Sequence, residues 1–170
     1  MCDDYLRYDI SPLSLSWSSF AIEMNVRGGA LTRTGSGMNY FLYQLWDSFL
    51  NLNNHYGQEK LKITMDSLDI WITSTELWNL NSEAFYKVIA EYTYSDEKYT
   101  PKLSIYNKEN QVLISTGATT GTGISALNNI YIGAELSTNR QYKNQWNDII
   151  DYVKIYKKTC NKARVFQIFF

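Results

Sequence analysis

The chain is poor in the residue types that most often build catalytic or metal sites. Its 170 residues include one histidine, His55, and two cysteines, Cys2 and Cys160, which lie near opposite ends. A Ser-His-Asp or Cys-His arrangement would need His55, and no Gly-x-Ser-x-Gly motif is present. A zinc site needs about four ligands, and the spacing of histidine and cysteine here offers none. The two cysteines agree equally with a disulfide and with two free thiols.

The chain also lacks an excess of one charge and any long apolar run. Its formal net charge is −1, whereas nucleic-acid binders usually carry a basic excess, so we expect no nucleic-acid partner. No apolar run approaches the roughly 20 residues of a membrane span, so we expect no transmembrane segment. Residues Met1–Asp9 lack the basic and apolar regions of a signal peptide, and we expect none in this chain.

Hydrophobic and aromatic residues, in contrast, are abundant, at 45% and 15% of the chain. A disordered chain would carry far fewer aromatic residues. The length suits a single domain over residues 1–170 and is sufficient to bury a core.

Apolar and polar residues alternate along much of the chain, with the period of β-strands. The clearest stripe is Phe20, Ile22, Met24 and Val26. Similar stretches predict strands at 61–65, 68–72, 86–94, 103–105 and 112–114, with turns at 66–67, 95–101 and 107–110. Residues 40–55 fit either a helical face or a hairpin that turns at 47–48.

A last long strand is predicted at Ile149–Tyr156, where β-branched and aromatic residues dominate. One face would carry Ile149, Asp151, Val153 and Ile155, and the other Ile150, Tyr152, Lys154 and Tyr156. A shorter strand with Ile130 and Ile132 would end at Gly133. The polar stretch 137–147 predicts a loop between these two strands.

Four motifs, in this order, resemble the concanavalin A-like lectin/glucanase superfamily and especially its laminin-G-like modules. They are the opening strand Ser19–Val26, the central strand Phe85–Tyr94, the hairpin Lys102–Ser115, and a closing pair formed by Ile130, Ile132 and Gly133 with Ile150, Asp151, Val153, Ile155 and Tyr156. The glycine usual before the closing strand is absent, and Trp146-Asn147 stands there instead. The resemblance favours the hairpin at 40–55.

The resemblance implies an all-β fold, an antiparallel two-sheet jelly-roll sandwich of the concanavalin A-like type. Its core would span about Leu13–Lys157, with residues 158–170 as a C-terminal tail or extra strand. Apolar residues dominate the end of this tail: Val165, Phe166, Ile168, Phe169 and Phe170. We expect a final strand that pairs with the N-terminal segment, or a contact with another subunit. A membrane-surface contact is a third alternative, for which the segment is short.

The superfamily includes glycoside hydrolases that carry a Glu-x-Asp-x-x-Glu set on one strand, and this motif is absent here. Glu23 and Glu91 lie alone on their predicted strands, so no carboxylate pair is evident for hydrolysis. We therefore expect no enzyme and no catalytic residue.

No cofactor is expected, with calcium left open. Relatives in the superfamily often bind calcium through loop oxygens, and acidic residues do occur in or near predicted loops, although without EF-hand spacing: Asp96, Glu97, Glu135 and Asp148.

Aromatic rings in or beside loops are the candidate ligand contacts, because flat rings pack against the apolar faces of sugars. The candidates are Trp46, Trp71, Trp78, Tyr99, Tyr142 and Trp146. The alternative for each is packing in the core or between subunits. The glycine-rich stretches 27–39 and 116–125 are interpreted as loops, since no P-loop motif is present.

Two function classes fit this sequence. The first is a non-catalytic surface recognition or assembly module, such as a bacteriophage-type fibre, decoration or capsid-associated protein, whose partners are itself, other structural subunits and glycans. The alternative is a carbohydrate-binding or adhesion module of a secreted or cell-surface protein, with a glycoside hydrolase or lyase third. The expected location is a virion or an extracellular surface. The start at Met1, the apolar tail and the abundance of Asn, Ile, Tyr and Lys favour the virion.

Overall fold

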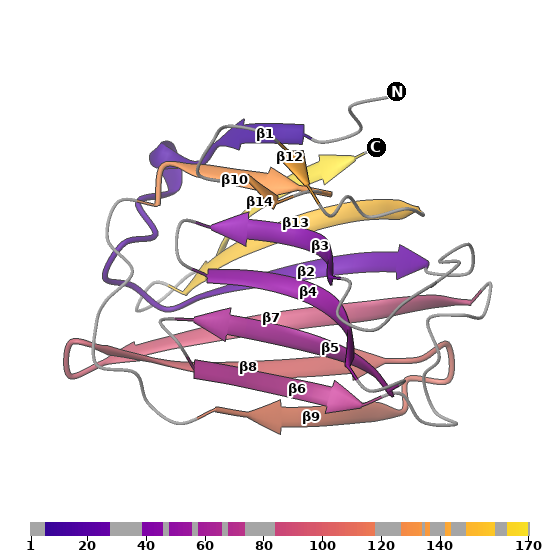
Figure 1. Cartoon of the computed structure of the whole chain (residues 1–170). Helices are drawn as coiled ribbons and strands as arrows, with labels where there is room; N and C mark the ends of the chain where they lie inside the picture. The colour runs from indigo at the N-terminus through magenta and orange to yellow at the C-terminus, as the bar shows by residue number, and fades with distance from the viewer. Residues whose placement is uncertain are drawn as a thin grey trace.

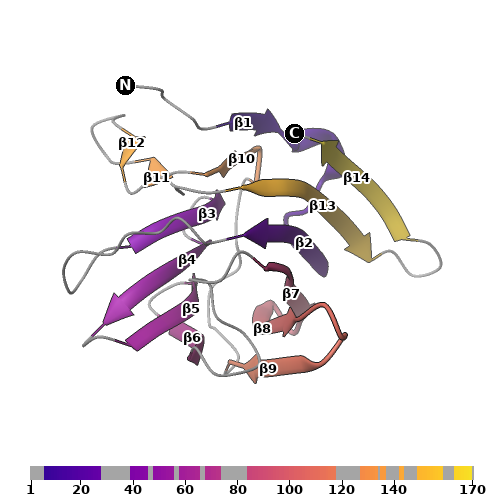
Figure 2. The same ribbon diagram turned by 90° about the vertical axis from the view of Figure 1, so that its right-hand side faces the viewer.

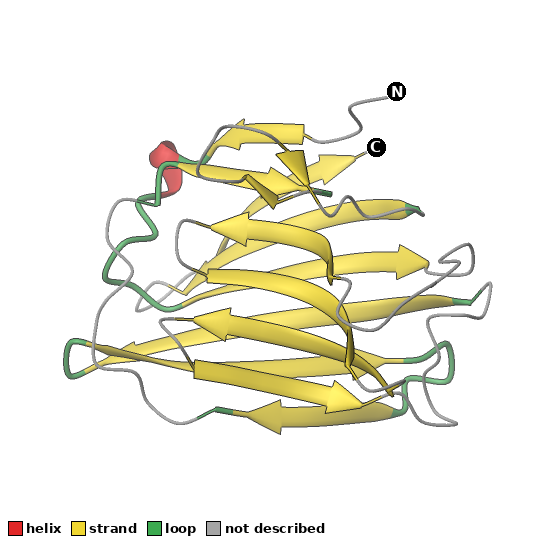
Figure 3. Cartoon of the chain, viewed as in Figure 1, coloured by secondary structure: helices red, strands yellow, loops and turns green. Residues whose placement is uncertain are grey.

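The computed structural model describes residues 6–27, 39–45, 48–55, 58–65, 68–73, 84–117, 127–133, 135–136, 142–143, 149–158 and 163–169. These residues form two large antiparallel sheets that pack face to face (Figure 3), and one short 3-10 turn, η1 (Ser11–Leu13). The all-β, antiparallel two-sheet sandwich predicted from the sequence is therefore confirmed.

The first sheet has six strands in the order β1-β10-β3-β4-β5-β6. They are β1 (Leu6–Asp9), β10 (Asn129–Ile132), β3 (Asn39–Leu45), β4 (Ser48–His55), β5 (Gln58–Met65) and β6 (Leu68–Thr73). The pairing of β3 with β4 settles the ambiguous stretch 40–55 as a hairpin. Gly133 ends β10 as predicted, with φ of 83°.

The second sheet also has six strands, in the order β14-β13-β2-β7-β8-β9 (Figures 1 and 2). They are β14 (Ala163–Phe169), β13 (Ile150–Lys158), β2 (Phe20–Arg27), β7 (Phe85–Ser95), β8 (Lys98–Tyr106) and β9 (Val112–Thr116). β11 (Glu135–Leu136) and β12 (Tyr142–Lys143) form a separate two-stranded ribbon, in which β11 lies beside β3 of the first sheet. The ribbon places a short strand inside the stretch 137–147 that was predicted as a loop.

One continuous apolar core fills the space between the sheets. The stripe Phe20, Ile22, Met24 and Val26 is buried as predicted, beside alternate residues of β7. Leu42, Leu45, Leu61 and Ile63 cover it from the first sheet. Burying one such side chain is worth about 1.5–3 kcal/mol, so these stripes account for much of what holds the two layers together.

The face assignment of β13 needs one correction. A β-bulge between Ile150 and Tyr152 shifts the register against β2, so Asp151 is exposed and Ile150 packs against the core. The sequence prediction placed Asp151 on the same face as Val153. The bulge reverses this because a buried carboxylate without a partner is costly, whereas here Asp151 accepts a hydrogen bond from Asn25 Nδ2 at 3.0 Å.

The stretch 95–101 was predicted to be a charged turn, and most of that prediction is wrong. The chain turns only at Asp96 and Glu97, whose φ values of 51° and 61° suit a two-residue hairpin turn. β8 begins at Lys98 and buries Tyr99 and Pro101. The inward-facing residues of β8 begin with Tyr99 and continue with Pro101, Leu103 and Ile105. The charged residues between and before them made this part of the strand look like a turn.

The C-terminal tail forms the strand β14, but its partner differs from the predicted one. It pairs with β13 over its whole length, from Ala163 opposite Lys158 to Phe169 opposite Tyr152. The N-terminal β1 pairs with β10 in the other sheet. Only residues 159–162 separate β13 from β14, and so short a connection favours direct antiparallel pairing. The predicted subunit contact through this tail stays a prediction.

Several sequence predictions lie outside the described residues. They concern Trp46, Trp78, Trp146, Phe170, the two cysteines and most of the glycine-rich stretches 27–39 and 116–125.

Candidate functional site

The candidate functional site is on the outer face of the second sheet, meaning the side that points away from the core. Burial alternates along β2 and β7, so every second residue is directed outward. Most outward residues of β13, β2 and β7 are polar or aromatic. They are Ala21, Glu23 and Asn25 in β2, Ile89, Glu91 and Thr93 in β7, and Tyr152, Lys154 and Tyr156 in β13.

Glu23 organises the half of this face that joins β2 to β13. Its two carboxylate oxygens accept hydrogen bonds from the hydroxyls of Tyr152, at 2.8 Å, and Tyr156, at 3.2 Å. Lys154 Nζ lies 3.7 Å from the same carboxylate and 4.3 Å from the ring centre of Tyr152. Burial and the negative charge of Glu23 raise the pKa of both tyrosines, so both hydroxyls donate as neutral groups.

A hollow of about 250 Å³ lies beside this cluster, and its position follows from the strand register. Tyr156, Ala21 and Glu91 stand opposite one another in one row across β13, β2 and β7. Ala21 has the smallest side chain of that row, which leaves a depression between its neighbours. The lining consists of Ser19, Phe20, Ala21, Glu91, Tyr92, Thr93, Tyr156 and Lys157.

The size and chemistry of the hollow suit one small polar ring rather than a large ligand. Pockets for drug-sized molecules occupy about 300–1,000 Å³, which exceeds this volume. Tyr156 supplies an aromatic wall, and Thr93 supplies a hydroxyl. Glu91 forms an ion pair with Lys102 Nζ at 2.7 Å. Lys157 Nζ donates to the carbonyls of Leu13, at 3.1 Å, and Ser14, at 2.6 Å, which fixes its charge at the margin.

Trp17 is an exposed aromatic residue, close in sequence to the lining of the hollow, that the sequence interpretation missed. Its side chain is 53% exposed, and its ring packs edge-on against Tyr94, with centroids 5.9 Å apart. It lies two residues before Ser19, while Tyr94 follows Thr93, and Ser19 and Thr93 both line the hollow. The residues Ser16-Trp17-Ser18-Ser19 carry no strand pattern, and only this aromatic residue among small polar ones could have marked the position.

The backbone around Trp17 is held in an uncommon conformation. Its φ is 59°, a left-handed value that costs a residue with a side chain roughly 1–2 kcal/mol. Ser18 stabilises the turn, because both its backbone N–H and its hydroxyl donate to the Leu15 carbonyl, at 3.2 and 2.7 Å. The same N–H donates to the hydroxyl of buried Tyr99 at 3.2 Å. The turn therefore keeps the Trp17 ring at the surface at an energetic cost.

The predicted ligand contacts are not brought together by the described structure. Trp71 is 48% exposed, but it belongs to β6 in the first sheet. Tyr99 is fully buried in the core, where its ring cannot meet a ligand, and this corrects its prediction as a surface contact. Tyr142 lies in the ribbon strand β12.

No group of three His, Cys, Asp or Glu side chains suited to a metal ion occurs among the described residues. Asp96 and Glu97, two of the possible calcium ligands, are exposed at the β7–β8 turn. Likewise, no helix in the described part of the chain has the length and apolarity needed to cross a membrane.

Comparisons with known proteins find likeness in structure alone. No protein-family model matches the chain, and no curated protein does. The enzymatically active domain of tailspike protein 2 from bacteriophage CBA120 is similar over 83% of this chain and 22% of its own, with a TM-score of 0.55 and 9% identity. A heptameric pentraxin from Limulus polyphemus is similar over 91% and 71%, with a TM-score of 0.55 and 10% identity.

Laminin supplies a third likeness. Domains LG4-5 of the mouse laminin alpha1 chain are similar over 97% of this chain and 44% of their own, with a TM-score of 0.50 and 13% identity. The chain thus spans about a fifth of the tailspike structures it matches. At such identities the likeness establishes a shared jelly-roll fold. The function has to be argued from the residues of the site.

Proposed function

We propose that this protein is a non-catalytic recognition module with a lectin-like fold, which binds carbohydrate in the hollow over Ala21. The observation that carries this proposal is a ring-sized hollow with Tyr156 in its wall, together with the exposed aromatic residue Trp17 two positions before Ser19 of its lining. Aromatic rings pack against the apolar face of a sugar, while Glu91, Thr93 and Lys157 offer partners for its hydroxyl groups.

The turn at Trp17 supports a binding role. Backbone strain persists where the surrounding structure over-determines it, and such positions cluster at functional sites. A tryptophan kept half exposed in a left-handed conformation has no evident benefit to the core. A ring fixed in advance also loses little conformational freedom when a ligand arrives.

The setting we propose is the surface of a virion or another extracellular surface. The tailspike neighbours support a phage particle, and the laminin and pentraxin neighbours support an adhesion or cell-surface module as the alternative. The two settings predict different ligands. A phage component should bind bacterial surface polysaccharide, whereas an adhesion module should bind animal glycans.

Binding of the purified protein to immobilised bacterial polysaccharides and animal glycans tests this proposal. The best ligand is then titrated against Trp17→Ala and against Trp71→Ala, the matched control on the first sheet. We expect Trp17→Ala to weaken binding about tenfold, which corresponds to about 1.4 kcal/mol, and Trp71→Ala to bind like wild type. Binding that fails in Trp71→Ala but survives in Trp17→Ala would place the site on the opposite sheet and contradict the proposal.

A glycoside hydrolase is the second candidate, because Glu23 and Glu91 lie on neighbouring strands of one face. Glu23 pairs with Ile89 and Glu91 with Ala21, which makes the two acids diagonal neighbours. Retaining hydrolases hold two carboxyl groups about 5–5.5 Å apart, with one serving as proton donor. Here each carboxylate already has strong partners, two tyrosine hydroxyls for Glu23 and Lys102 for Glu91. These contacts support binding without turnover.

The assay for this alternative is the release of new reducing ends from any polysaccharide that binds. We expect none from wild type. Release by wild type that disappears in Glu91→Gln, with binding retained, would make the protein an enzyme.

A further inference from the structure

The free edge of β9 carries backbone groups that have no partner among the described residues. Among the described strands, β9 is the last of the second sheet and pairs with β8 alone (Figures 1 and 2). Bonds from Asn107 N to Gln111 O, at 3.1 Å, and from Gly117 N to Pro101 O, at 2.9 Å, bracket this ladder. Since bonded pairs alternate in an antiparallel ladder, Leu113 and Ser115 bond to β8. The N–H and C=O groups of Val112, Ile114 and Thr116 therefore point away from the sheet.

The same residues direct their side chains outward. Val112 is 40% exposed and Ile114 is 54% exposed, whereas Leu113 packs against the core. A strand added to this edge would gain backbone hydrogen bonds and would cover two exposed aliphatic side chains. Both features favour pairing with another β-strand.

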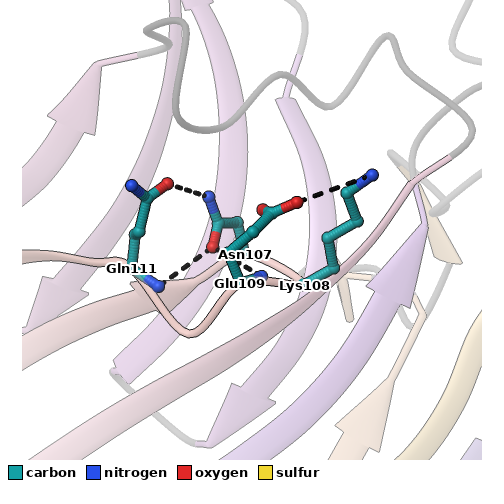
Figure 4. A network of polar contacts seen from close by, with 4 residues as sticks. All are labelled: Asn107, Lys108, Glu109 and Gln111. Carbon is teal, nitrogen blue, oxygen red and sulfur yellow. Dashed lines mark hydrogen bonds and ion pairs between the residues drawn. The ribbon is translucent and has the colours of Figure 1, made fainter.

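Within the part of the chain that the structure describes, this edge has none of the usual protection against such pairing. Soluble proteins commonly shield edge strands with charged residues, proline or bulges. The stretch Gln111–Gly117 has no charged residue and no proline, and its ladder with β8 has no register shift. The turn before it is rigidly built, because the Asn107 side chain bonds to Gln111 and to the backbone of Glu109 (Figure 4).

Charge around the edge selects a second copy of this chain as the occupant. Two lysines lie near this edge. Lys102 of β8 is directly opposite Thr116, and Lys87 of β7 is opposite Tyr106, which is itself opposite Val112. Lys102 is neutralised by Glu91, and Lys87 Nζ lies 4.5 Å from the ring centre of Tyr106. The strand itself is uncharged, one flanking lysine is ion-paired and the other lies over an aromatic ring, so two copies can meet here with little like-charge repulsion. A charged peptide would gain no complementary charge there.

We propose that the β9 edges of two copies pair antiparallel about a twofold axis at Ile114. Ile114 would then face the partner's Ile114, and Val112 would face the partner's Thr116. The three free N–H groups of each copy would meet the three free carbonyls of the other, so every open group of β9 is satisfied. Such an interface is isologous and closed, and it joins the two second sheets into one continuous sheet.

Light scattering of the full chain over a concentration series tests this interface. We expect a monomer–dimer equilibrium for wild type and a monomer for Ile114→Lys, because two lysines would then oppose each other at the axis. The matched control is Leu6→Lys, which charges a residue of 40% exposure on the edge of the first sheet. It should dimerise like wild type.

A proline at the same position separates backbone pairing from side-chain charge. Ile114→Pro removes an N–H that points to the free edge and no bond to β8, so the fold should persist while the dimer is lost. Amide exchange supplies a readout on wild type itself. The Val112, Ile114 and Thr116 amides should exchange slowly in the dimer and fast at dilution. A wild type that stays monomeric, or a dimer that survives in Ile114→Lys, overturns the proposal, and neither result bears on glycan binding at the hollow.

Discussion

The hydroxyl groups of Tyr43 and Tyr92 lie 2.6 Å apart in the centre of the sandwich. Tyr43 belongs to β3 in the first sheet and Tyr92 to β7 in the second, so this hydrogen bond joins the two layers. Both residues are almost fully buried, and burial, followed by the neighbouring Tyr92, raises the pKa of Tyr43 well above that of free tyrosine. Each hydroxyl is thereby hydrogen-bonded although it is buried away from water.

We predict that removing one hydroxyl of this pair lowers the free energy of unfolding by more than half of the loss caused by removing both. Tyr43→Phe leaves the Tyr92 hydroxyl with a lost partner in the core, so the free energy of unfolding should fall by about 1–3 kcal/mol. Tyr43→Phe combined with Tyr92→Phe should cost less than the sum of the single changes. Urea unfolding of the four proteins measures the coupling, and strict additivity would contradict the prediction.

We predict that stability falls at alkaline pH, partly because of Tyr152 and Tyr156. Burial and the nearby Glu23 raise the pKa of both residues in the folded state. Their contribution is complete below the unfolded-state pKa of about 10 and is lost as pH rises above it, because the unfolded state then releases protons more readily than the folded state does. Replacing both tyrosines with phenylalanine should flatten the decline in unfolding free energy between pH 9 and 11. An unchanged slope in that variant would contradict this account.

We predict that Gly117→Ala destabilises the junction between β9 and the first sheet. A Cβ at this position would lie 2.6 Å from Ile70 Cγ2 and 2.9 Å from Pro101 Cγ, so both neighbours would have to move. Overpacking of this kind costs about 1–3 kcal/mol. Ile70→Leu, which has no branch at Cβ, should recover part of that loss in the double variant. Thermal unfolding measures it, with the exposed neighbour Thr116→Ala as control.

We predict that Asn107 stabilises the β8–β9 turn through its side-chain oxygen. Asn107 Oδ1 accepts hydrogen bonds from the backbone N–H groups of Glu109 and Gln111, each at 3.0 Å (Figure 4). Asn107→Ala should lower the free energy of unfolding by about 1 kcal/mol. Asn107→Asp keeps the acceptor and loses the bond from Nδ2 to Gln111, so it should lie close to wild type. Equal losses in the two variants would contradict the role given to the oxygen.

The strands themselves were predictable because their apolar period is local information. The stripe from Phe20 to Val26 and the alternation along β7 both need one face buried, and a one-residue slip would expose the whole set. The β3–β4 hairpin was ambiguous on its own, because its apolar residues fit a helix as well. Only the resemblance to laminin-G-like modules favoured the hairpin before the structure confirmed it.

The candidate site was not predictable in the same way. The tyrosines that bind Glu23 lie 129 and 133 residues away in the sequence. The hollow exists because β2 lies between β13 and β7, which sets Ala21 between Tyr156 and Glu91. No local pattern carries that information. Tyr99 shows the converse error, since a ring beside charged turn residues was predicted at the surface and lies in the core.

The sequence by itself therefore determined the all-β class, the main strands and most of their buried faces, because alternation and turn residues act over a few positions. Tertiary structure alone decided which strands became neighbours, and with that the Glu23 cluster, the hollow and the free edge of β9. It also decided the exposure of Trp17, since the turn that presents the ring depends on the hydroxyl of buried Tyr99, 81 residues from Ser18. Contacts over such separations arise only when segments far apart in the sequence pair as neighbouring strands and pack on a common core.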